Sequence, residues 1–174
     1  MLPFLAALLS GAAVTAGATD ANVGNLPGLF ESTCLDGQAK LSAGDVTASS
    51  FDQLPSGLRE SLGHPASGNV WRLNTAGNSY LYVLNYAAGP GISPKVCGLA
   101  SDAMDLRTAS NALGARVAGG VERNTSGRSS QWLNARDGYV ATATSAATLK
   151  VLQISWMSDE DKARAMEQVE QLPH

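Results

Sequence analysis

The sequence predicts an α+β fold, with a mostly antiparallel sheet of about six strands and three helices packed on it. Two stretches of alternating apolar and polar residues flank turn sequences, and each is followed by a third apolar run and by residues with helical spacing. The expected order is α-βββ-α-βββ-α. An antiparallel sheet needs one covered face and tolerates a solvated second face. The sequence leaves open whether the two β-rich halves form one sheet or two.

The first third of the chain carries the weakest signals of regular structure. Residues 29–35 fit a short helix or a strand, of which the helix is favoured, and residues 38–50 are ambiguous because they are rich in Ser, Ala and Gly. Residues 55–62 predict a short helix, since Pro55 suits a first turn and Gly63 suits the position after the last turn.

A first hairpin is predicted over residues 69–75 and 78–86, with a two-residue loop at Ala76-Gly77. This loop would pair Trp71 with Tyr82. Because side chains alternate along a strand, one face of the hairpin is then expected to carry the following apolar and aromatic residues: Trp71, Leu73, Tyr80, Tyr82 and Leu84. The opposite face is also mostly apolar, so the hairpin is expected in the interior of the sheet.

A strand over residues 95–99 and a helix over about 103–117 follow this hairpin. Asp102 is the expected N-cap of the helix, with Asp105 at its third position. The segment 121–128 is polar and is expected to form a loop. The helix presents an apolar stripe made of Leu106, Ala109, Leu113 and Val117.

The second half begins with a hairpin over residues 129–135 and 139–145, signalled by the turn sequence Asp137-Gly138. A third strand is predicted over 148–156. It is apolar on both faces in its centre, which places it inside the sheet.

A last helix is predicted to begin after Ser158, an N-cap whose third residue, Asp161, completes a pattern like a capping box. Glu160 and Arg164 are four residues apart and are expected to form an ion pair. The inward-facing residues of this helix are expected to be Met166, Val169 and Leu172.

Residues 1–18 resemble an export signal. The apolar run ends in Ala16-Gly17-Ala18, the small-x-small pattern that signal peptidase needs. The basic segment that usually precedes such a run is missing, since no Lys or Arg precedes Lys40. The run is too short and too diluted by Gly and Thr for a transmembrane helix. The sequence therefore predicts a signal peptide over 1–18 and a single periplasmic or secreted domain over 19–174, without a membrane anchor. The alternative is an ordinary N-terminal core helix.

Cys34 and Cys97 are the two cysteines of the chain. In an oxidising compartment an even count predicts a disulfide, and two cysteines allow a single connectivity. The alternative is two buried free thiols. A redox pair is not expected, because the chain has no C-x-x-C sequence.

The sequence Phe30-Glu31-Ser32-Thr33-Cys34 follows the export signal, and Cys97 lies on a predicted strand. This pattern resembles small exported bacterial proteins of unknown function, which open with F-x3-C and carry a second cysteine 50–70 residues later. The resemblance implies no activity.

Composition and motifs exclude several classes of function. The net charge of −3 argues against nucleic acid as a partner. His64, in a Gly-His-Pro turn, is the one internal histidine, and neither Ser61 nor Ser67 lies in a G-x-S-x-G motif. No spacing of His and Cys predicts a metal site. No cofactor fingerprint is present either.

Other charged or Gly-rich segments have ordinary structural explanations. The segment 89–95 contains two prolines, which remove backbone N–H groups that a phosphate would need. Asp102 with Asp105, and the acidic run 159–161, fall in first turns of helices, where capping accounts for them. Arg123 and Arg128 are expected in a solvated loop, and contact with an anionic partner is the alternative.

The most suggestive surface is an aromatic one, formed by Trp71, Tyr80, Tyr82 and Tyr86. Aromatic residues on an exposed sheet bind a protein, a peptide or a glycan, whereas the alternative is that a helix covers them. The sequence therefore predicts a non-enzymatic binding or accessory module of the cell envelope. The competing hypothesis is a small hydrolase or an enzyme inhibitor whose site is not visible from sequence spacing.

Overall fold

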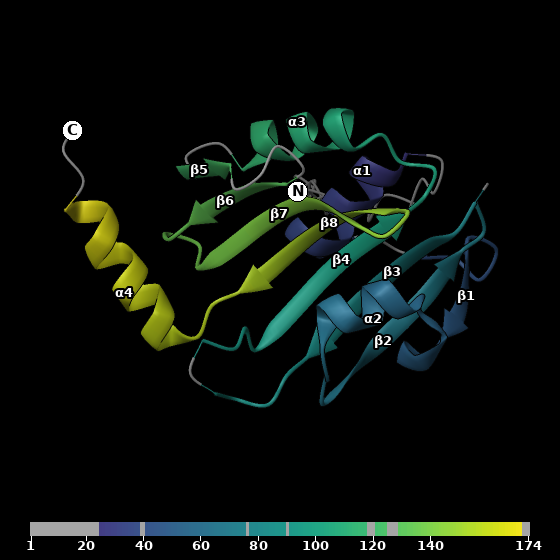
Figure 1. Ribbon diagram of the computed structural model, residues 1–174, viewed down its shortest axis with the longest axis horizontal. Helices are drawn as coiled ribbons and strands as arrows, with labels where there is room; N and C mark the ends of the chain where they lie inside the picture. The colour runs from purple at the N-terminus through teal and green to yellow at the C-terminus, as the bar shows by residue number, and fades with distance from the viewer. Residues whose placement is uncertain are drawn as a thin grey trace, which may run out of the picture.

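The described chain forms one continuous antiparallel sheet with helices on both of its faces (Figure 1). The computed structural model describes residues 25–38, 41–75, 77–89, 91–117, 121–124 and 129–171, and gives the backbone alone for 121–124. The predicted signal peptide over 1–18 lies outside these residues. Within them, the α+β class and the antiparallel sheet are confirmed, whereas the expected six strands and three helices are wrong: the sheet has eight strands, and there are four α-helices.

The eight strands form two meanders of four strands each, which join through their last strands. The spatial order is β1-β2-β3-β4-β8-β7-β6-β5, so both halves belong to one sheet. The strands are β1 (Val46–Ser49), β2 (Ser67–Leu73), β3 (Ser79–Asn85), β4 (Lys95–Ser101), β5 (Val121–Asn124), β6 (Ser130–Asn134), β7 (Tyr139–Ala146) and β8 (Leu149–Trp156).

Four α-helices and two short helical turns accompany the sheet. They are α1 (Leu26–Phe30), the π-helical turn η1 (Glu31–Leu35), the 3₁₀ turn η2 (Phe51–Gln53), α2 (Ser56–Leu62), α3 (Leu106–Arg116) and α4 (Asp159–Glu170). Helices α1 and α3 pack on one face, here called the back face, and α2 packs on the other, the front face (Figure 1). The short helix predicted over 55–62 is confirmed, and Gly63 ends it with φ of 69°.

Two edge strands, β1 and β5, lie in segments without a strand pattern in the sequence. Residues 38–50 were ambiguous and 121–128 were expected to form a loop, yet each contributes a four-residue strand at an outer edge of the sheet. The loop expectation for 121–124 is therefore wrong. An edge strand has hydrogen bonds to a neighbouring strand on one side only. A short strand of this kind can form through these backbone bonds without an alternating apolar pattern in its sequence.

Helix α3 begins a turn later than predicted, because Asp105 and not Asp102 is its N-cap. The Asp105 carboxylate accepts a hydrogen bond from the backbone N–H of Thr108 (2.8 Å), and the bonds from Thr108 lower the pKa of Asp105. Asp102 instead accepts hydrogen bonds from the backbone N–H and the side-chain amide of Asn78, each at 2.9 Å. It therefore fixes the end of the β2–β3 connection.

The predicted first hairpin is present, but its register is shifted by one residue. Trp71 pairs with Leu81, and Tyr82 pairs with Val70. On the two sides of the predicted loop, the Asn74 backbone N–H donates to the Asp45 carbonyl and the Asn78 backbone N–H donates to Asp102. Ala76 of that loop lies outside the described residues. A shift of one residue exchanges the faces of one strand relative to the other.

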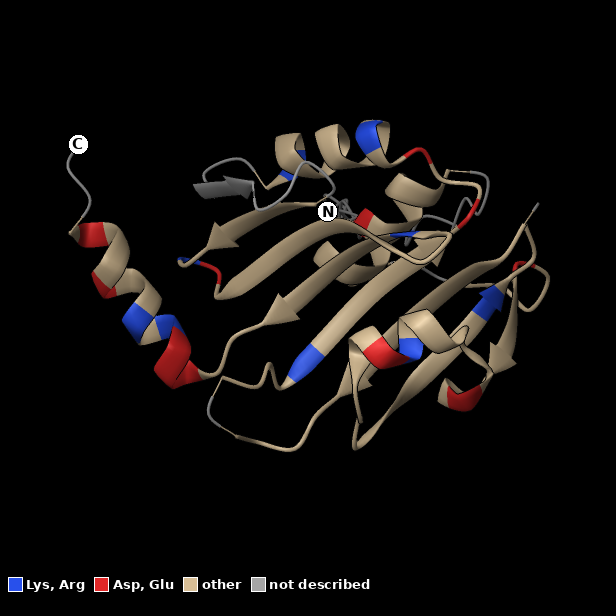
Figure 2. Cartoon of the chain, viewed as in Figure 1, with Lys and Arg blue, Asp and Glu red and all other residues tan. Residues whose placement is uncertain are grey.

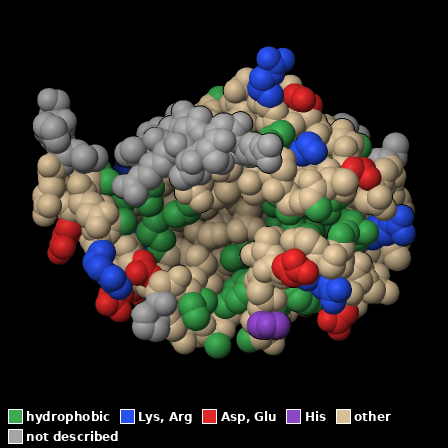
Figure 3. Space-filling model, viewed as in Figure 1, with side chains coloured by type: hydrophobic (Ala, Val, Ile, Leu, Met, Phe, Trp, Pro, Cys, Tyr) green, Lys and Arg blue, Asp and Glu red, His purple; other side chains and the backbone are tan. Residues whose placement is uncertain are grey.

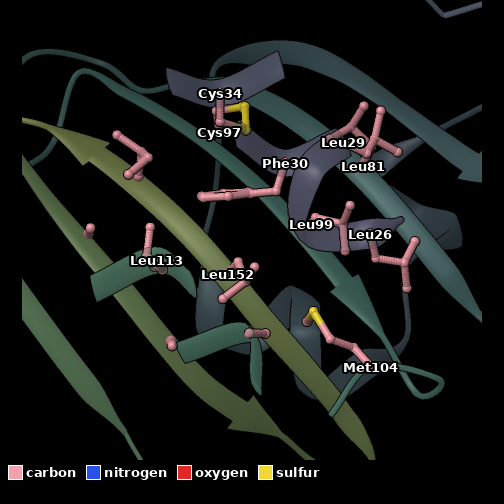
Figure 4. Close-up of a cluster of buried hydrophobic side chains, with 14 of the residues drawn as sticks. Leu26, Leu29, Phe30, Cys34, Leu81, Cys97, Leu99, Met104, Leu113 and Leu152 are labelled. Atoms are coloured by element: carbon pink, nitrogen blue, oxygen red, sulfur yellow. A yellow bond between two sulfur atoms is a disulfide. The ribbon is translucent and has the colours of Figure 1, made fainter. Parts of the chain in front are cut away.

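The two faces of the sheet enclose two cores. The back core lies beneath α1, η1 and α3 and contains the disulfide, as Figure 4 shows for part of it. Its largest fully buried side chains are Leu29, Phe30, Leu73, Leu81, Leu99, Leu113, Val117, Leu152 and Ile154. The front core lies beneath α2 and is built from Leu54, Leu58, Leu62, Val70, Tyr80, Tyr82, Leu84, Val96, Ala100, Leu149 and Val151.

The Cys34–Cys97 disulfide is confirmed, with the two Cα atoms 5.5 Å apart. It ties the helical turn η1 to the interior strand β4, and both cysteines are buried. The helix favoured over 29–35 is confirmed as the end of α1 together with η1. A disulfide is compatible with an extracellular location. In the part of the chain that the structure describes, no helix is long and apolar enough to span a bilayer.

The second half follows the prediction closely. The hairpin of β6 and β7 is confirmed, with four turn residues before Tyr139 and Gly138 at φ of 78°. Strand β8 lies inside the sheet, between β4 and β7, as expected.

Helix α4 begins at the predicted cap but faces the protein differently from the prediction. The Ser158 hydroxyl accepts from the Asp161 backbone N–H, and Arg164 pairs with Glu160 at 3.0 Å. The expected burial of Met166 is wrong: it is 37% exposed, and Ala165 is the buried residue. The reason is that α4 extends away from the end of the sheet and does not lie across it (Figure 1). Val169 is half-buried, and Leu172 lies outside the described residues.

Candidate functional site

The four aromatic residues of the predicted binding face do not form one surface. Trp71 lies on the back face, because the shifted register places it opposite Leu81. Tyr82 is fully buried, and Tyr80 is 9% exposed, both in the front core beneath α2. The expected shared face is therefore wrong for Trp71. Tyr86 is half-buried and borders a hollow on the front face.

This hollow, here called the Gln153 hollow, is lined by the end of α2, by strand β8 and by described residues of the β3–β4 connection. Its volume is about 140 Å³. The Tyr86 hydroxyl donates to the Leu62 carbonyl (2.7 Å), which fixes the ring against the end of α2. The lining residues are Ser61, Leu62, Tyr86, Ile92, Ser93, Val96, Gln153 and Ser155.

A chain of hydrogen bonds orients the floor of the Gln153 hollow from beneath. The buried Tyr82 hydroxyl donates to Gln153 Oε1 (3.0 Å), and Gln153 Nε2 donates to Ser155 Oγ (3.0 Å). Ser155 Oγ accepts this bond, and its own O–H has no acceptor among the described residues, so it remains available as a donor. The bond from Tyr82 therefore orients the Gln153 amide, and through it the Ser155 hydroxyl.

Gly98 makes this hydrogen-bond chain possible. In one row across the sheet, Tyr82 pairs with Gly98 and Gly98 pairs with Gln153, so the tyrosine side chain must cross β4 to reach β8. A Cβ atom at Gly98 would collide with the phenol ring and hydroxyl of Tyr82. Both residues are visible in the sequence, but the pairing of Tyr82 with Gly98 can be recognised only once the register of β3, β4 and β8 is known.

The front face continues from the hollow as an open strip over β6 and β7. Here the open strip means Gln131, Leu133, Val140, Thr142 and Thr144, all of which are half-buried. Their register places Thr142 beside Gln153 and Val140 beside Ser155. Strands β6 and β7 contain no charged residue (Figure 2). Among the described helices, α2 covers this face, and it reaches β7 near the turn where Gly57 meets Ala147.

The open strip and the hollow together offer hydroxyl and amide groups on a mildly apolar floor. In the view of Figure 3 the centre of this face carries uncharged side chains, and charged ones gather around it. This arrangement can bind a polar, uncharged molecule through hydrogen bonds. It presents no nucleophile activated by a neighbouring base.

Burial perturbs the two tyrosines at this site. It raises the pKa of Tyr82 above its ordinary value of 10.0, and the neighbouring Tyr86 adds to the rise. Burial also raises the pKa of Tyr86. Both phenols therefore hold their protons more tightly in the folded chain than in the unfolded chain.

We expect the free energy of unfolding to decrease above about pH 10. A raised folded-state pKa contributes stability that is fully present below the unfolded pKa and is lost as the pH rises. Each such tyrosine adds a slope of up to about 1.4 kcal/mol per pH unit. Urea denaturation from about pH 8 to about pH 11 measures this slope, which should be shallower in Tyr82→Phe. Equal slopes for both proteins would contradict a buried Tyr82 phenol.

Another hollow on the outer side of α2 brings His64 close to hydroxyl and carboxylate groups. Its volume is about 480 Å³, and its lining residues are Phe51, Asp52, Ser56, Arg59, Glu60, Gly63 and His64. Within the described residues His64 makes no hydrogen bond, so no base is coupled to Ser56. Ser61 instead donates to the Leu58 carbonyl (2.8 Å).

Other residues considered from the sequence have structural roles or cannot be placed. Asp105 caps α3, Asp102 binds Asn78, and Asp161 lies at the capped start of α4. Among the described residues no group of three or more His, Cys, Asp and Glu could hold a metal ion. The side chain of Arg123 and the whole of Arg128 lie outside the described residues.

No protein-family model, curated protein or solved structure matches this chain significantly. The assignment of a function therefore depends on the geometry of the chain's own residues.

Proposed function

We propose that this chain is a small exported binding module of the cell envelope, periplasmic or secreted, which recognises a neutral glycan. The ligand would occupy the Gln153 hollow and extend along the open strip. The observation that carries the proposal is the hydrogen-bond chain from Tyr82 through Gln153 to Ser155, which orients polar groups at the floor of an uncharged surface. The expected signal peptide and the disulfide support the location.

The chemistry of this surface favours a sugar over other ligands. Hydroxyl and amide side chains both donate and accept hydrogen bonds, which matches the hydroxyl groups of a sugar. A folded protein partner would be expected to bury a more apolar centre with aromatic anchors. A charged ligand would need an opposite charge, and the described side chains of the open strip have none. Tyr86 and the exposed Ile92 supply apolar contact at one end.

A hydrolase or an enzyme inhibitor is the alternative function. Its best support is the hollow that contains His64, Ser56 and two carboxylates. We favour binding because no hydrogen bond couples these groups in the described residues, whereas the groups at Gln153 are coupled and oriented.

The test is calorimetric titration with neutral oligomers of β-linked glucose and of N-acetylglucosamine. We expect saturable binding that weakens about fivefold in Gln153→Ala, the loss of roughly one hydrogen bond. Gln168→Ala is the matched control, because Gln168 is an exposed glutamine on α4, away from the hollow. Equal affinity in Gln153→Ala, stronger binding to uncharged peptides, or cleavage of the oligomers would each overturn the proposal.

A further inference from the structure

A separate hollow at the opposite side of the front face contains an arginine without an ionic partner. Its volume is about 240 Å³, and it lies between β1, β2, β3 and η2. We call it the Arg72 hollow. Its lining residues are Thr47, Ala48, Ser49, Gln53, Arg72 and Tyr80, none of which belongs to the Gln153 hollow or the open strip.

Strand register places the arginine in the middle of a polar row. Thr47 on β1 pairs with Arg72 on β2, and Arg72 pairs with Tyr80 on β3. Side chains paired in this way share a face and lie next to each other. Tyr80 is 9% exposed, so neighbouring side chains restrict its ring, and it lines the hollow together with Arg72.

The side chain of Gln53 is oriented so that it presents hydrogen-bond donors. Its Oε1 atom accepts two bonds, one from the Ser49 hydroxyl and one from the Ser50 backbone N–H, each at 2.9 Å. The amide oxygen is therefore occupied, and the NH₂ group remains available. The capping of η2 thus determines which end of the amide is free.

The free groups of the Arg72 hollow are predominantly donors. Arg72 forms no ion pair with a described residue, and the Tyr80 hydroxyl has no hydrogen-bond partner among them. No carboxylate lines the hollow. The Thr47 hydroxyl is already directed to Asn74 Oδ1 (3.4 Å), so it does not count among the free donors.

We propose that the Arg72 hollow binds an oxyanion, a carboxylate or a phosphate group, through the Arg72 guanidinium, the Gln53 amide and the Tyr80 hydroxyl. A guanidinium group offers a planar fork of donors that matches two oxygen atoms of such a group. The ligand of this site differs in charge from the neutral glycan proposed for the Gln153 hollow, and the two hollows share no lining residue, so each proposal can be tested separately.

The experiment is an NMR titration of the ¹⁵N-labelled protein with inorganic phosphate, glucuronate and glucose. We expect saturable shifts for the residues of the Arg72 hollow with phosphate or glucuronate and none with glucose. In Arg72→Gln the affinity for the bound anion should decrease by about tenfold or more, because a charge-assisted pair is lost. Tyr80→Phe, which keeps the ring, should cause a smaller loss. Preference for glucuronate would identify a carboxylate site, and preference for phosphate a phosphate site.

Arg136→Gln is the matched control, since Arg136 is an exposed arginine in the β6–β7 turn and should bind as the unmodified protein does. Shifts that rise linearly without saturation, or an equal loss in Arg136→Gln, would overturn the proposal. An unchanged affinity in Arg72→Gln would do the same. Gln153→Ala should leave the anion titration unchanged, so a failure of the proposed glycan site would be distinguishable from a failure of this one.

Discussion

Replacing Tyr82 with alanine should lower the free energy of unfolding by about 3–5 kcal/mol, the usual cost of truncating a large buried aromatic residue. Tyr82 is fully buried and belongs to the front core. Its ring also crosses β4 at Gly98 and reaches β8, so it joins strands from both halves of the sheet. Truncation would leave a cavity at the junction of the two meanders.

Urea denaturation of Tyr82→Ala measures this loss, and Tyr82→Phe separates packing from hydrogen bonding. The phenylalanine variant keeps the ring and loses the bond to Gln153, so it should cost about 1 kcal/mol. Gln153 would then lose its fixed orientation, and glycan affinity should fall in Tyr82→Phe although the fold is retained. A loss below about 1 kcal/mol for Tyr82→Ala would contradict the burial of this ring.

Removing the disulfide should lower the free energy of unfolding by about 2–4 kcal/mol. The bridge closes a loop between residues 63 positions apart, which restricts the unfolded chain. It also holds η1, a short turn with Cys34 as its buried residue, against β4. The variant of choice is Cys34→Ala with Cys97→Ala, because alanine buries no new polar group in the back core.

Urea denaturation of the double variant and of the unmodified protein gives the difference in stability. Circular dichroism should show that the sheet still forms, since the eight strands are paired independently of the bridge. Non-reducing peptide mapping of protein taken from the cell envelope should recover Cys34 linked to Cys97. Two alkylatable thiols in that material would contradict both the bridge and the proposed location.

Features that depend on neighbouring residues along the chain could be predicted from the sequence. Ser158 caps α4, Gly63 ends α2, and the Asp137-Gly138 sequence lies in the β6–β7 turn, all as expected. Each is determined by backbone groups within a few residues, so the local sequence contains all the partners. The disulfide was also predictable, because two cysteines allow one pairing.

The candidate site was predicted only in part. Tyr86 does line the Gln153 hollow, but Gln153, Ser155 and the open strip gave no signal as separate residues. Arg72 likewise became a candidate only when its neighbours on β1 and β3 were known. Polar residues of this kind are common on any sheet, and their spacing along the chain does not show which of them meet.

The sequence by itself therefore determined the class of fold, the order of most elements, their caps and the disulfide. The tertiary structure decided the register of β2 against β3, the edge strands β1 and β5, and the single sheet made by joining β4 to β8. These depend on hydrogen bonds between residues far apart in the chain, such as Asn78 with Asp102 and Asn74 with Asp45. Alternate residues of a strand face opposite sides of the sheet, so a register shift of one residue changes which side chains share a face. Such long-range bonds therefore help to determine which side chains meet at a site.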